Sequence, residues 1–131
     1  MTQLDDFIAG NGQTKFEWGK HDCAHFAARW AAARAGKDFL LSFPAWANAK
    51  RALRLQQELG GLACAVTSVL GEPIKDAPRD GDIALLPDKL GGLCIVYGAY
   101  VVGPAATVGL AFFPFTDAQL FWRLPCQTSQ K

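Results

Sequence analysis

The residue composition of the chain changes character near residue 71, and this change constrains the fold more than any other feature. The part before it is rich in Ala, Leu, Gln and Arg, which favour helices. The part after it is rich in Val, Ile, Phe and Tyr broken by Gly and Pro, which favour strands and turns. Helices followed by strands predict an α+β domain, with a helical half of about residues 1–70 and a strand half of about residues 78–125.

Length and composition exclude several classes of protein. The 131 residues predict one domain over residues 1–131, and with 50% hydrophobic and 19% charged residues the chain has the material for a packed core. A net charge of +1 predicts no nucleic-acid partner, and no apolar run is long enough to predict a membrane span. The first residues show neither a basic nor an apolar signal region, so we expect synthesis in the cytoplasm.

Hydrophobic spacing and turn residues predict the individual elements. The clearest is a helix over residues 23–35, because Asp22 is a good N-cap and Gly36 a good residue to follow a helix end. We expect the strands to form an antiparallel meander packed on this helix, with the strand at 93–97 buried on both faces. The other expected helices cover residues 3–9, 45–59 and 62–70 with a turn at 117–120, and the expected strands cover 82–86, 93–97, 100–102, 107–113 and 121–124.

Cys23 is the first candidate for chemistry, because the predicted helix starts there. The partial positive charge at a helix N-terminus stabilises a thiolate, so the position predicts a lowered thiol pKa and a candidate nucleophile. The alternative is that Cys23 is a core residue, as we expect for most of the four cysteines. Both histidines of the chain, His21 and His25, lie within two residues of it.

Three short motifs lie in a fixed order along the chain. The first is Phe16-x-Trp18-Gly19-x-x-Asp22-Cys23-Ala24-x-Phe26, the second is Gly81-Asp82-Ile83 at the start of an expected strand, and the third is an apolar strand that ends at Gly98. Together these residues resemble the NlpC/P60 group of papain-like cysteine peptidases. They are most similar to a phage and prophage branch encoded among tail-tip genes, whose members often end in a segment like Phe121-Trp122-Arg123. The resemblance implies a papain-like fold, with N-terminal helices packed on a C-terminal antiparallel sheet.

The chain departs from this resemblance at the catalytic base. In active members a histidine opens the second strand, which corresponds here to residues 91–93, and no histidine follows His25. His25 stands about 200° around the helix from Cys23 and cannot share a proton with it. His21 precedes the cap and is the weaker candidate base, while Asp22 is expected to cap the helix or to orient a partner. His21, Cys23 and His25 are metal-ligand types, but residues two apart on a helix cannot face one ion, so we expect no metal or cofactor.

These observations predict a structural component of a phage or prophage tail tip, built on a degenerate NlpC/P60-like scaffold and located in the virion tail. Its expected partners are other tail-tip proteins. The rival is a cysteine peptidase or amidase that cleaves cell-wall peptide crosslinks, with Cys23 as nucleophile and peptidoglycan peptides as substrate. The apolar run at residues 112–115 predicts exposed aromatic side chains at an interface. We expect Lys50, Arg51 and Arg54 to form a solvated helix face.

Overall fold

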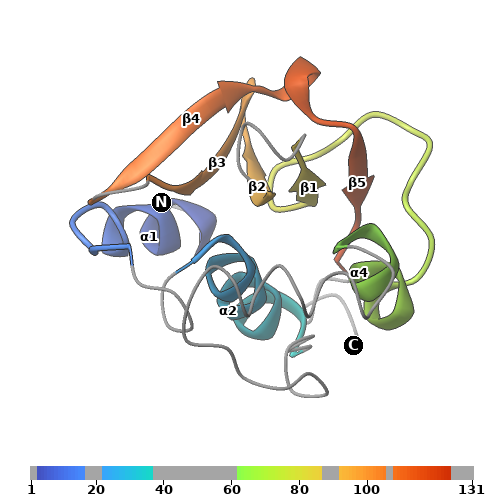
Figure 1. Ribbon diagram of the computed structural model, residues 1–131, viewed down its shortest axis with the longest axis horizontal. Coiled ribbons are helices and arrows are strands. Elements are labelled where there is room, and N and C mark those ends of the chain that lie inside the picture. The colour runs from blue at the N-terminus through green and yellow to red at the C-terminus, as the bar shows by residue number, and fades with distance from the viewer. Residues whose placement is uncertain (1–2, 17–21, 37–61, 87–91, 106–107, 125–131) are drawn as a thin grey trace.

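The computed structural model describes residues 3–16, 22–36, 62–86, 92–105 and 108–124 (Figure 1). Over these residues the chain forms helices first and strands afterwards, which confirms the predicted α+β class. The expected helix at residues 45–59 and its basic face lie outside the described residues. Within the described part, no helix is long and apolar enough to cross a membrane.

Five antiparallel strands form one sheet in the order β4-β3-β2-β1-β5. The meander prediction is right for four strands and wrong for the fifth, because β5 returns across the sheet and pairs with β1 (Figure 1). In this register Ile83 lies between Ile95 and Trp122. The strands are β1 (Ile83–Leu85), β2 (Leu93–Tyr97), β3 (Tyr100–Pro104), β4 (Leu110–Pro114) and β5 (Leu120–Trp122).

The three described helices are α1 (Gln3–Gly10), α2 (Cys23–Ala35) and α4 (Leu62–Leu70). The ends of α2 are those predicted, since the Asp22 side chain accepts the backbone N–H of His25 and Gly36 ends the helix with a φ of 70°. All three helices lie on the same side of the sheet (Figure 1). Phe7 joins α1 to α2 by packing its ring 5.3 Å from Phe26 and 5.4 Å from Trp30.

Both faces of the sheet are buried at its centre, as the continuous apolar run of β2 predicts. On the helix side, Ile83, Leu93 and Ile95 join Phe26, Trp30 and other residues of α1, α2 and α4 in the main core. The opposite face forms a smaller cluster, against which Phe113, Ala118 and Phe121 pack. The buried members of that cluster are Ala84, Leu86, Cys94, Val96 and Val101.

The start of β4 differs from the predicted strand at 107–113. Val108 forms only an isolated bridge with Lys15, and β4 begins at Leu110. Gly109 separates the two with a φ of +81°, and a Cβ there would lie 3.0 Å from the Gly12 carbonyl oxygen. The expected helical turn at 117–120 is instead the 3-10 helix η2 (Phe115–Asp117), which follows directly after Pro114.

A buried hydrogen bond attaches α2 to the entrance of β1. Trp30 Nε1 donates to the carbonyl oxygen of Gly81 over 2.7 Å, and Trp30 is fully buried. The approach is close, because a Cβ on Gly81 would lie 3.2 Å from Cζ2 of the Trp30 ring, and Gly81 has a φ of +92°. Glycine is therefore required at this position for both its conformation and its size.

We expect Gly81→Ala to destabilise the protein by about 2–4 kcal/mol, because it adds a steric clash to backbone strain. The matched variant is Gly98→Ala, since Gly98 has a φ of +63° but a Cβ added there would meet nothing within 4 Å. That variant should lose only about 1–2 kcal/mol. Urea unfolding measures both, and equal losses would show that the contact with Trp30 is not tight.

Candidate functional site

Cys23 is the first residue of α2 and faces the beginning of β2. Asp22, which caps the helix, is almost completely buried; the residue Cys23 is partly exposed, but its thiol group is buried. The cap is confirmed by two hydrogen bonds: the Asp22 side chain accepts the His25 N–H over 2.9 Å, and the Asp22 carbonyl accepts the Phe26 N–H over 2.9 Å. The thiol is thus held at a well-defined helix N-terminus.

The prediction of a lowered thiol pKa at Cys23 is wrong. The pKa of Cys23 is raised to about 11: desolvation by burial is the largest cause and the negative charge of Asp22 also raises it, while a hydrogen bond from the backbone of Leu93 opposes them only in part. The prediction took account of the helix N-terminus but not of the burial of the thiol or the carboxylate beside it. At pH 7 a thiol with this pKa is ionised to about one part in ten thousand, so the residue is a poor nucleophile.

Leu93 occupies the place where the resemblance implies a catalytic histidine, because it is the first residue of β2. Its side chain is fully buried in the main core, and its backbone contributes the hydrogen bond to the Cys23 thiol. The neighbouring Cys94 lies on the opposite face of the sheet, where burial raises its pKa to about 12. On β2, the group that contacts the Cys23 thiol is therefore the backbone of Leu93.

His25 binds Asp22 rather than Cys23. Its Nδ1 lies 2.8 Å from Oδ1 of Asp22, and its side chain is 25% exposed. This contact was not among the predictions, although an acid at the cap and a histidine three positions later is the spacing that brings the two side chains together. His21, the other candidate base, lies outside the described residues.

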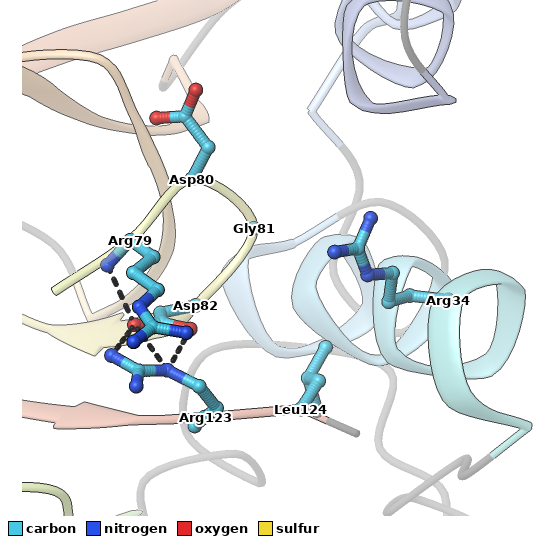
Figure 2. A pocket seen from close by; sticks show the side chains of 7 residues that line it. All are labelled: Arg34, Arg79, Asp80, Gly81, Asp82, Arg123 and Leu124. Carbon is cyan, nitrogen blue, oxygen red and sulfur yellow. Dashed lines mark hydrogen bonds and ion pairs between the residues drawn. The ribbon is translucent and has the colours of Figure 1, made fainter. Parts of the chain in front are cut away.

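A second polar cluster joins two motifs that lie far apart in the sequence. Asp82, at the entrance of β1, accepts hydrogen bonds from Nε and Nη2 of Arg123 at 3.0–3.3 Å, and its Oδ2 also accepts the Arg79 N–H over 2.8 Å (Figure 2). Arg123 continues to Asp76 at 3.2 Å and to the carbonyl of Ala77 at 2.9 Å. The signal for this pair was the presence of one acid and one arginine beside strand ends, but only the pairing of β5 with β1 brings them together.

Exposed aromatic side chains gather around β3 and β4, as predicted for the run at 112–115. Tyr100 is 50% exposed, Phe112 49% and Phe115 37%, and the rings of Tyr100 and Phe112 meet edge to face at 6.2 Å. We call these three residues the aromatic patch. Cys64 on α4 is also exposed, unlike the buried position expected for most of the cysteines. Among the described side chains, no three metal-ligand types are grouped closely enough to hold an ion.

A family model covers nearly the whole chain. The model of the domain of unknown function DUF6950 matches residues 1–124. The chain belongs to this family. The match includes both the Asp22–Cys23 helix start and the Asp82–Arg123 pair, so both clusters lie inside the DUF6950 domain. No curated protein matches the chain.

We expect Asp22→Asn to make Cys23 more reactive. Asparagine caps helices about as well as aspartate, so the helix start is retained while the charge that raises the pKa of Cys23 is removed. Alkylation of Cys23 by iodoacetamide at about pH 8, followed by peptide mass spectrometry, should become roughly two- to tenfold faster. Asp117→Asn removes an exposed carboxylate elsewhere and should not change the rate. A rate unchanged in Asp22→Asn would mean that Asp22 does not act on the thiol.

We expect Asp82→Asn to destabilise the protein by about 2–4 kcal/mol, because it removes the buried partner of Arg123. Asp76 contacts the same guanidinium but is 61% exposed, against 4% for Asp82. Asp76→Asn should therefore unfold at nearly the same urea concentration as the unmodified protein. If the two variants lost equal stability, burial would not be what makes the Asp82 contact important.

Proposed function

We propose that this protein is a non-catalytic assembly component, built on a degenerate NlpC/P60-like scaffold of papain type and acting in a phage or prophage tail tip. The observation that supports this proposal most strongly is the environment of Cys23. Its thiol has a pKa raised to about 11, and Leu93 stands at the head of β2, where an enzyme of this group would need its base.

The chemistry around Cys23 favours a structural role for that residue. A cysteine hydrolase needs a thiolate and a base that accepts and returns a proton. Here burial and the Asp22 charge both favour the neutral thiol, and Asp22 engages His25. A neutral, buried thiol packed against the start of β2 contributes to the core as a small apolar side chain would.

The aromatic patch supports a role in binding another protein. Aromatic residues are enriched at protein interfaces, and solvent exposure of several of them together is unusual for a surface without a partner. The rings of Tyr100 and Phe112 contact each other, and Phe115 directly follows β4, which forms an edge of the described sheet. Neighbouring tail-tip subunits are the partners that the resemblance implies.

One observation favours the rival function, a cysteine peptidase or amidase acting on cell-wall peptides. Cys23 is partly accessible at the N-terminus of α2, and the Leu93 backbone bond lowers its pKa against the other effects. His21 would then have to act as the base.

The two functions differ in what Cys23→Ala does. In the virus or prophage that carries the gene, we expect deletion of the gene to abolish infectious particles and Cys23→Ala to leave their yield unchanged. Purified protein should release no more peptide from peptidoglycan than the Cys23→Ala variant does. Cys64→Ala, at an exposed cysteine, is the control for loss of a thiol. Particle yield as low as in the deletion, together with peptide release that requires Cys23, would establish the peptidase instead.

A further inference from the structure

A pocket of about 300 Å³ lies at the other end of α2 from Cys23 (Figure 2). Its wall contains three arginines and two aspartates, contributed by the last turn of α2, the loop before β1 and the residues after β5. Arg34 follows Cys23 by eleven residues on α2, which places the two about 16 Å apart along the helix. The pocket is thus separate from the cysteine site, and its volume is at the lower end for small-ligand sites.

Two of the three arginines keep their guanidinium groups available. Arg123 is occupied by Asp82 and Asp76, whereas neither Arg34 nor Arg79 forms an ion pair with a carboxylate of the described residues. Asp80, the remaining acid of the wall, accepts the N–H of Gly98 over 2.7 Å. Figure 2 shows its carboxylate directed away from both Arg34 and Arg79.

The Arg34 side chain and the backbone of Arg79 are both held by contacts within the protein. Arg34 lies over the ring of Trp30 with Cζ 5.7 Å from the ring centroid, which leaves the edge of the guanidinium free to donate. Trp30 is in turn bonded to Gly81, and the backbone N–H of Arg79 is bonded to Asp82. The backbone that carries both side chains is therefore ordered before any ligand arrives, which lowers the entropic cost of binding.

We propose that this pocket binds a carboxylate group of a peptide, supplied either by a C-terminus or by an acidic side chain of a partner protein. Guanidinium groups match the planar carboxylate with paired hydrogen bonds. Asp76, Asp80 and Asp82 keep the surroundings of the pocket from being strongly positive, which disfavours a phosphate group carrying nearly two charges. Leu124 adds an apolar wall for the carbon atoms beside the carboxylate. This proposal does not depend on whether Cys23 is reactive.

The test is a titration followed by ¹H–¹⁵N nuclear magnetic resonance at about pH 7. The probes are N-acetylalanine, which has a terminal carboxylate, and N-acetylglutamic acid amide, which has only a side-chain carboxylate. N-acetylalanine amide is the neutral control and inorganic phosphate the competing anion. We expect saturable shifts of the Asp80 and Gly81 amides and of the Arg34 Nε–H signal with at least one carboxylate probe. The probe that binds more tightly identifies the source of the carboxylate.

Substitutions then connect the binding to the two arginines. Arg34→Gln and Arg79→Gln should each weaken binding by about fivefold or more, the effect expected from losing a charge-assisted hydrogen bond. Lys15→Gln removes one positive charge from an exposed site outside the pocket and should leave binding unchanged. The Trp30 indole signal reports whether each variant keeps the fold. Equal binding of the neutral amide, tighter binding of phosphate, no saturation, or undiminished binding by both arginine variants would overturn the proposal.

Discussion

The hydrogen bond from the Trp30 indole to the Gly81 carbonyl is the contact on which the arrangement of this fold depends. It is buried, it joins residues 51 positions apart, and it fixes the middle of α2 against the entrance of the sheet. One end of the helix then brings Cys23 to the start of β2, and the other brings Arg34 opposite the loop before β1. Because one element carries both residues, a shift of α2 would disturb the cysteine site and the arginine pocket together.

The ion pair between Asp82 and Arg123 lies beside the pairing of β5 with β1. A carboxylate as deeply buried as that of Asp82 is costly unless it is paired and hydrogen-bonded, and it is satisfied here by the Arg123 guanidinium and the Arg79 N–H. Arg123 follows directly after β5, so the same contact holds β5 beside β1 rather than beside β4. The charge pair thus stabilises the one strand pairing that departs from a simple meander.

Local signals made part of this structure predictable. The ends of α2 follow from Asp22 and Gly36, and the burial of β2 follows from its continuous apolar residues, because caps and hydrophobic runs act within a few positions. The return of β5 to β1 could not be predicted in this way, since it depends on Ile83 meeting Trp122 across 39 residues of chain. The prediction of a lowered pKa for Cys23 was wrong for a related reason. The helix end is visible in the sequence, but the packing that removes water from the thiol is not.

The two ends of α2 carry polar groups in contrasting environments, with Cys23 at one end and Arg34 at the other. At Cys23 burial is the largest influence and favours the neutral thiol, and the Asp22 charge adds to it, whereas the hydrogen bond from the Leu93 backbone opposes both. The Arg34 side chain keeps its positive charge without help from a neighbouring acid, because a guanidinium stays protonated at physiological pH even against an aromatic ring. The Trp30 contact holds the Arg34 side chain and the Asp82 contact holds the backbone of Arg79, so of these two arginines the Arg79 side chain is the one still to be ordered when the proposed ligand binds.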